Sequence, residues 1–86
     1  PPARPLTGAA LRARAEAPDG AVRRAGHDLP RVRATALRML GRAGDTEHVA
    51  VVRAGLEDRD EAVRRAAALA LERMVERLDL PGEQLL

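Results

Sequence analysis

A short pattern occurs twice in this chain, 31 residues apart, and it constrains the fold more than any other feature. In each copy an Asp precedes a Val-Arg pair that opens an Ala- and Leu-rich run. Asp28 lies four residues before its Val, and Asp58 lies five residues before its own. A helical repeat of this length is typical of a solenoid, in which each helix pair buries its apolar face against its neighbours. The matched positions are Val32/Val63, Arg33/Arg64, Ala36/Ala67, Leu40/Leu71 and Arg42/Arg73.

Turn residues divide the chain into five expected helices, at about residues 7–17, 21–25, 30–40, 46–56 and 60–79. The first is expected to stop at Pro18-Asp19-Gly20 and the third across Gly41–Gly44, because these residues favour turns over helix interiors. Pro30 suits the first turn of the third helix. We therefore expect an all-α fold, a short α-solenoid of about two and a half helix pairs.

The expected segments follow this division. They are an extended lead-in (1–6), a degenerate or capping helix pair (7–27), a full repeat (28–57), a half repeat with a long final helix (58–80) and a tail (81–86).

The core of this chain must be built from small side chains. The sequence has no Phe, Trp or Tyr, but it has eighteen alanines. Small residues bury little area each, so stability depends on close packing of neighbouring helices. At 100° per residue, one face of the last helix holds an apolar set, which is Val63, Ala67, Ala70, Leu71, Met74 and Leu78.

Two arginines fall at the edge of these apolar faces. Arg33 and Arg64 would be costly there unless each guanidinium met an acid and backbone carbonyls. Asp28 and Asp58 stand before them at nearly the same offset, so we expect them to be the partners.

The Asp…Val-Arg-x-x-Ala-x-x-x-Leu spacing of residues 28–78 resembles HEAT-like repeats of the phycobilisome-lyase type. In that family the repeated Asp and Arg form a ladder between successive repeats. The resemblance implies this structural role for Asp28, Arg33, Asp58 and Arg64. It also implies that the second helices of the pairs line a concave surface on which partners bind.

The resemblance favours a protein-interaction scaffold with no catalysis of its own. We expect it to be part of a larger chain or complex, because residue 1 is a proline and not the methionine of a translation start. One alternative to the scaffold is a non-catalytic segment of a lyase-type HEAT-repeat enzyme.

Charge is distributed unevenly along the chain. Residues 1–44 carry nine Arg and three acids, a net +6, whereas residues 45–86 carry six Arg and ten acids, a net −4. Such asymmetry can mark an anion-binding end or a head-to-tail contact. It supports a further alternative, an arginine-dependent anion or nucleic-acid-binding module, although the chain has no aromatic side chains to stack on bases. The candidate binding surface is Arg23, Arg24, Arg31, Arg38, Arg42 and Arg53.

The final helix offers a second candidate surface. Leu69, Val75 and Leu78 lie on a helix with no following helix to cover it, so we expect a protein contact there, which could join two copies of the chain.

Other classes of protein find little support in the sequence. All basic residues are Arg, as in a GC-rich, bacterial-like composition. Without Cys there are no disulfides or thiolate metal sites, and no apolar run or leader points to a membrane or to secretion, so we expect a cytoplasmic protein. Without Ser or Cys there is no usual nucleophile. His27 and His48 are interpreted as a turn residue and a helix-flank residue, and we expect no metal and no cofactor.

Overall fold

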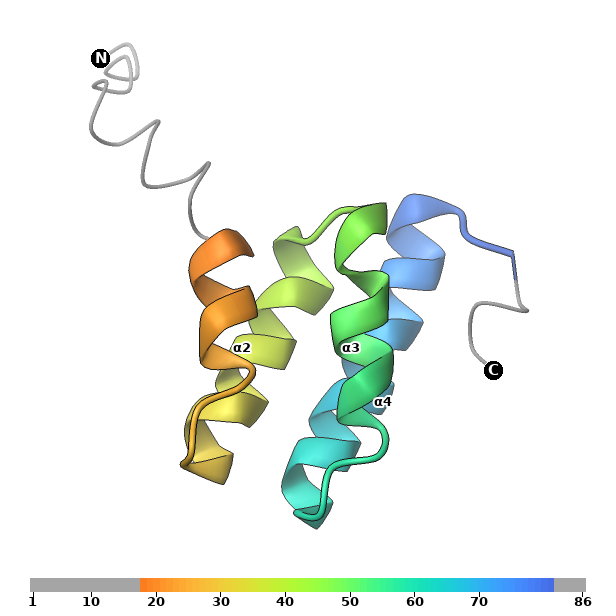
Figure 1. Cartoon of the computed structure of the whole chain (residues 1–86). Helices are drawn as coiled ribbons and strands as arrows, with labels where there is room; N and C mark the ends of the chain where they lie inside the picture. Colours follow the sequence, from red (N-terminus) through yellow and green to blue (C-terminus); the bar gives the residue numbers. More distant parts are fainter. Residues whose placement is uncertain (1–17, 82–86) are drawn as a thin grey trace, which may run out of the picture.

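The computed structural model describes residues 18–81, and over that range it is helical with no strand. A helical stretch at residues 18–24 is followed by α2 (Pro30–Ala43), the short 3-10 helix η1 (Thr46–His48), α3 (Val49–Gly55) and α4 (Glu61–Leu78). These described residues form two layers, with residues 18–24 and α3 in front and α2 and α4 behind (Figure 1). The expected helix 7–17 and the lead-in 1–6 lie outside the described residues, so the described part has four α-helical stretches and not five.

One of the expected helix boundaries is wrong. Residues 18–20 are helical and do not form a turn. Proline, aspartate and glycine are only local disfavouring signals, and here the fully buried Ala21 ties this stretch to the core. The stop expected across Gly41–Gly44 is confirmed, because α2 ends at Ala43 and is capped at Gly44.

Local sequence signals explain how the other helices begin and end. Pro30 occupies the first turn of α2, where its missing N–H costs nothing. The Asp60 carboxylate accepts hydrogen bonds from the N–H groups of Ala62 and Val63, at 2.9 and 3.2 Å, and so caps α4. At its other end α4 stops at Asp79, whose φ of 52° is left-handed.

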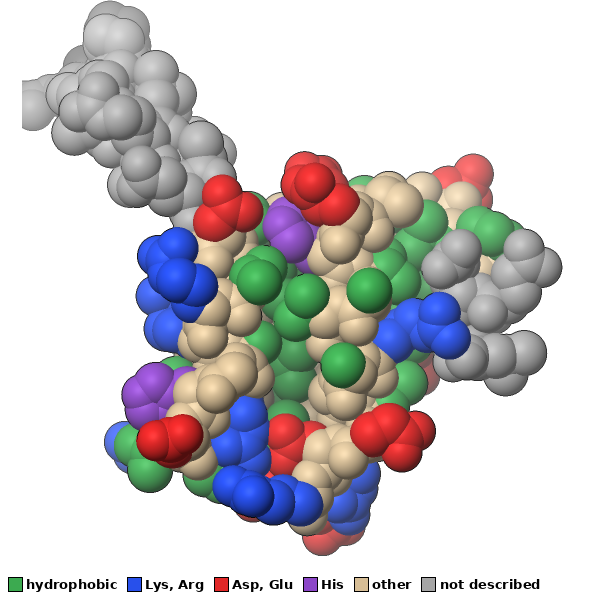
Figure 2. All heavy atoms as spheres, in the orientation of Figure 1, with side chains coloured by type: hydrophobic (Ala, Val, Ile, Leu, Met, Phe, Trp, Pro, Cys, Tyr) green, Lys and Arg blue, Asp and Glu red, His purple; other side chains and the backbone are tan. Residues whose placement is uncertain are grey.

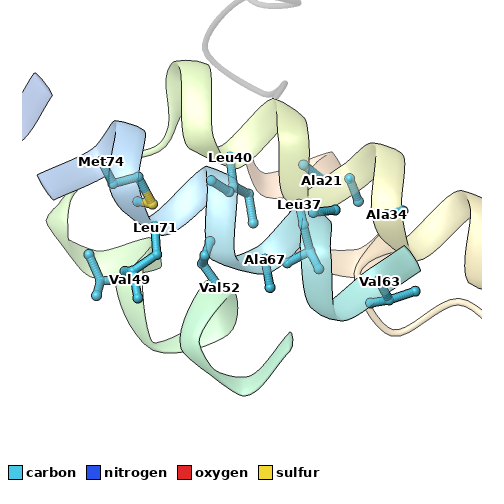
Figure 3. Close-up of a cluster of buried hydrophobic side chains, with 13 residues drawn as sticks. Ala21, Ala34, Leu37, Leu40, Val49, Val52, Val63, Ala67, Leu71 and Met74 are labelled. Atoms are coloured by element: carbon cyan, nitrogen blue, oxygen red, sulfur yellow. The ribbon is translucent and has the colours of Figure 1, made fainter. Parts of the chain in front are cut away.

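The core is a single aliphatic cluster between the two layers (Figure 3). The apolar face expected on α4 is confirmed for Val63, Ala67, Ala70, Leu71 and Met74, whereas Leu78 is only half-buried. The largest fully buried side chains are Leu37, Leu40, Val52, Val63, Leu71 and Met74.

Two glycines allow close helix contacts within this core. A Cβ built at Gly41 of α2 would lie 2.8 Å from the Cα of Ala70 in α4. Gly55 of α3 is similarly enclosed, since a Cβ there would lie 2.7 Å from Leu37 and 2.9 Å from Ala67. The absence of aromatic residues is thus matched by backbones that approach each other closely.

Candidate functional site

The most regular polar feature of the structure is an ion pair between the two copies of the repeat. Arg33 of α2 donates from Nε and Nη2 to the two carboxylate oxygens of Asp58, at 2.9 and 3.0 Å. Its Nη1 donates to the backbone carbonyls of His27 and Asp28, at 2.9 and 2.8 Å. The two side chains are 8% and 15% exposed. We call this Arg33–Asp58 pair the rung.

Each partner of the rung stabilises the charged form of the other. Hydrogen bonding from Arg33 lowers the pKa of Asp58 below its usual value, and the backbone N–H of Asp60, which donates to Asp58 at 2.9 Å, lowers it further. Hydrogen bonding to Asp58 raises the pKa of Arg33, although its burial acts in the opposite direction. A bidentate pair with these satisfied bonds holds two repeats together and leaves no group free for chemistry.

The other two residues expected in the ladder do not form a second rung. Arg64 is exposed, and its Nη1 donates to the backbone carbonyl of Asp58 at 2.8 Å. The Asp28 carboxylate accepts no hydrogen bond within residues 18–81. The structure thus pairs an Arg with the Asp of the next repeat, and the pairing within one repeat that we expected from the constant offset is wrong.

A second inter-helix contact by an arginine was missed by the sequence analysis. Arg77 of α4 donates from Nη2 to the carbonyls of Gly41 and Gly44, at 3.2 and 2.6 Å. These carbonyls lie at the end of α2, where the helix leaves its acceptors unsatisfied. A basic residue in the last turn of a helix can be recognised in the sequence. Whether its side chain contacts another helix depends on tertiary packing.

The arginines of the predicted binding surface are all exposed, and they lie on three elements. Arg31, Arg38 and Arg42 belong to α2, which contains no acidic residue. Arg23 and Arg24 lie on the helical stretch 18–24, where blue side chains gather at its edge (Figure 2). The sixth, Arg53, lies on α3 and has an interaction partner.

An apolar groove of about 350 Å³ separates the stretch 18–26 from α3. Figure 2 shows hydrophobic side chains gathered between these two elements. A second hollow of about 340 Å³ lies beside α3 and shares Ala54 with the groove. Of the residues that line the two hollows, the sequence analysis singled out Asp58 and Arg53 and missed the rest, because alanines and glycines in helices carry no functional signal of their own. The groove is lined by Val22, Ala25, Gly26, Leu37, Val51, Ala54, Gly55 and Asp58.

The contact surface expected on α4 is less apolar than its sequence indicates. Leu69 is 43% exposed. Val75 is half-buried, and Leu78 packs against the core cluster. One large apolar side chain on α4 therefore faces solvent, and the three residues do not make one exposed patch.

The histidines have local structural roles. Nδ1 of His27 accepts a hydrogen bond from the N–H of Leu29 at 3.0 Å. His48 is buried, and its Nδ1 accepts from the N–H of Asp45 at 2.8 Å. The proton of the neutral ring is then on Nε2, so this nitrogen has no lone pair for a metal. Within the described part of the chain, no group of three or more His, Cys, Asp or Glu side chains is placed to hold a metal ion.

The helices described here are also too short or too polar to span a bilayer.

Comparison with known proteins bears on the repeat itself. The family model described as HEAT repeats matches residues 23–82, which is more than half of the chain. No curated protein and no solved structure matches the chain significantly. The matched range contains the rung, the α2–α4 contact and most of the groove. The chain belongs to the HEAT-repeat family.

Proposed function

We propose that this chain is a protein-interaction scaffold module with no catalysis of its own, and that it binds its partner in the groove between residues 18–26 and α3. The observation that carries this proposal is the groove itself, which is apolar and open on one face of the molecule. HEAT repeats commonly serve as interaction scaffolds, which agrees with such a role.

The chemistry of the groove favours side chains of a protein partner over a small molecule. Its volume is at the lower end of the range for ligand pockets, about 300–1,000 Å³. Its one ionisable lining residue, Asp58, is already bonded to Arg33. Affinity would therefore come from burial of apolar side chains, as when an amphipathic helix binds in a groove.

Ala54 is the best position for a test, because it is exposed and borders both hollows. Random peptides displayed on phage would be selected on the full chain, and binding would then be measured to Ala54→Glu. Ala68→Glu, at an exposed alanine of α4, is the matched control. We expect peptides with apolar residues at helical spacing that bind the control and the unmodified chain but not Ala54→Glu. Equal binding to both variants would contradict the groove as the site.

A second candidate function has its own supporting observation. The helix α2 carries four Arg and no acid, and Arg31, Arg38 and Arg42 on it are exposed. Such a stripe could bind the phosphates of a nucleic acid. This role predicts binding to a single-stranded oligonucleotide that weakens steeply with salt and is lost when Arg38 and Arg42 are both changed to Glu. Unchanged binding in that double variant would exclude it.

We also propose a narrower type of repeat and the role in a larger enzyme that would follow from it. The phycobilisome-lyase type of repeat is supported by the Asp and Val-Arg spacing of residues 28–78, and would make the chain a non-catalytic segment of such an enzyme. Absorbance titration of the full chain with a bilin tests this, since no spectral change would argue against it.

A further inference from the structure

We propose that a hollow between α2 and α4 binds a phosphate group, held by Arg42, Arg73 and Arg77. This site is separate from the apolar groove, so it does not depend on the scaffold function proposed above. It shares only Arg42 with the arginine stripe of α2.

The hollow has a volume of about 320 Å³ and a basic lining. Its lining consists of Gly41 and Arg42 of α2 with Arg73, Glu76 and Arg77 of α4. Three arginines against one glutamate give a formal net charge of +2. None of the five residues has a large apolar side chain, so a ligand here would be bound by charge and hydrogen bonds.

The repeat itself brings two of these arginines together. Arg42 and Arg73 occupy equivalent positions, 31 residues apart in the sequence. Arg42 follows Gly41, where a Cβ would lie 2.8 Å from the Cα of Ala70, and Arg73 lies one turn after Ala70. The close contact of the two helices therefore places both arginines around one hollow.

Neither of these two arginines is paired with an acid in the described part of the chain. Arg42 and Arg73 are exposed, and within residues 18–81 they form no hydrogen bond and no ion pair. Glu76 lines the same hollow without an ion pair to either of them. Like charges held near each other repel, and an anion bound between them would relieve that repulsion. Both guanidinium groups are thus available to a ligand.

The third arginine is fixed in place by the end of α2. Arg77 donates from Nε and Nη2 to the carbonyl of Gly41, at 3.4 and 3.2 Å, and from Nη2 to the carbonyl of Gly44 at 2.6 Å. Its Nη1 has no hydrogen bond among the described residues. Carbonyl groups at the end of a helix repel anions, but here Arg77 occupies two of them. Arg77 therefore shields the hollow from these carbonyls and retains a donor for a ligand.

Charge and donor number favour a phosphate monoester over a carboxylate. Such a phosphate carries a charge of about −2 at neutral pH and three acceptor oxygens. It can accept from three guanidinium groups and balances the net charge of the lining. A carboxylate has one charge and two oxygens, so it would leave an arginine without a partner. A small phosphorylated molecule and a phosphorylated side chain of a partner protein both present the required group.

Isothermal titration calorimetry of the full 86-residue chain with inorganic phosphate tests the site. We expect saturable binding that acetate at the same ionic strength does not reproduce. Arg73→Gln should weaken phosphate binding by about tenfold, because it removes charge-assisted hydrogen bonds. Arg31→Gln removes the same charge at an exposed position of α2 outside the hollow, and it should bind phosphate like the unmodified chain. Glu76→Gln should tighten binding, because it removes the acid from the lining.

Urea denaturation of each variant checks that it is folded, and Arg42→Gln replaces Arg73→Gln if that variant is not. Glycerol phosphate and a short phosphoserine peptide then identify the source of the group. Tighter binding of the peptide assigns the phosphate to a partner protein, and any other order assigns it to a small molecule. A chain with no saturable phosphate binding, or a Glu76→Gln variant that binds more weakly, would overturn the proposal. An equal loss in Arg31→Gln and Arg73→Gln would do so as well, because it would indicate diffuse attraction by the arginines in general.

Discussion

Gly41 is the position at which the packing of the two repeats can be tested most simply. In most helix interiors, a change from Gly to Ala stabilises a protein by about 1 kcal/mol, because alanine is the better helix former. Here the added methyl would lie 2.8 Å from the Cα of Ala70 and 2.9 Å from its Cβ. The obstacle is backbone, which cannot rotate away as the end of a side chain can.

For Gly41→Ala, the free-energy cost of overpacking should exceed the gain in helix propensity. Overpacking a close contact costs about 1–3 kcal/mol, and a clash with backbone belongs at the upper end of that range. After subtraction of the propensity gain, we expect Gly41→Ala to lose roughly 1–2 kcal/mol. A chain of this size has a stability of roughly 4–13 kcal/mol, so the loss is readily measured.

Urea denaturation followed by far-UV circular dichroism is the appropriate assay for Gly41→Ala. Gly26→Ala is the matched control, because the nearest atom to its added methyl is the carbonyl oxygen of Arg23, at an ordinary 3.7 Å. We expect the control to be neutral or slightly stabilised. A Gly41→Ala variant more stable than the unmodified chain would refute the close contact of α2 with α4.

Three further outcomes follow from the polar contacts. Because the pKa of Asp58 is lowered in the folded state, its contribution to stability is present above the unfolded value near 4 and is lost as pH falls through the folded value. Asp58→Asn should therefore flatten the fall of the urea midpoint at acid pH, and an unchanged pH profile would contradict this. Arg64→Ala should shift the midpoint little, as at exposed positions generally, and a loss as large as that from Arg33→Ala would contradict the assignment of the rung. Arg77→Gln should cost about 1 kcal/mol, because two carbonyls at the end of α2 lose their donor, and an unaltered melting temperature would argue against that contact.

The elements that sequence predicts well are those whose signals are local. The periodic apolar residues of α4 and the proline that opens α2 depend on neighbours within one or two turns, and the structure agrees with them. The wrong boundary at Pro18-Asp19-Gly20 shows the limit of such signals, because burial of the adjacent Ala21 outweighs three weak helix formers.

Features that join one helix to another were harder to predict. Each repeat carries one Asp shortly before its Arg, so the sequence alone could not tell whether Arg33 bonds the Asp of its own repeat or that of the next. The contact of Arg77 with the end of α2 and the apolar groove depend on how helices stack, which no local pattern specifies. The repeat could therefore be predicted from the sequence, whereas the groove could be identified only in the structure.

The central claim is that the regular charges of the repeat are joints between helix pairs. A double-mutant cycle tests it most directly, with Arg33→Met and Asp58→Asn made singly and together and unfolding followed in urea. The exposed pair of Arg65 and Glu61, whose atoms are 3.0 Å apart within α4, provides the reference cycle. Pairs of this i,i+4 kind contribute about 0.3–0.5 kcal/mol. We predict a coupling between Arg33 and Asp58 clearly larger than the reference, and a coupling no larger than that of Arg65 and Glu61 would contradict the claim.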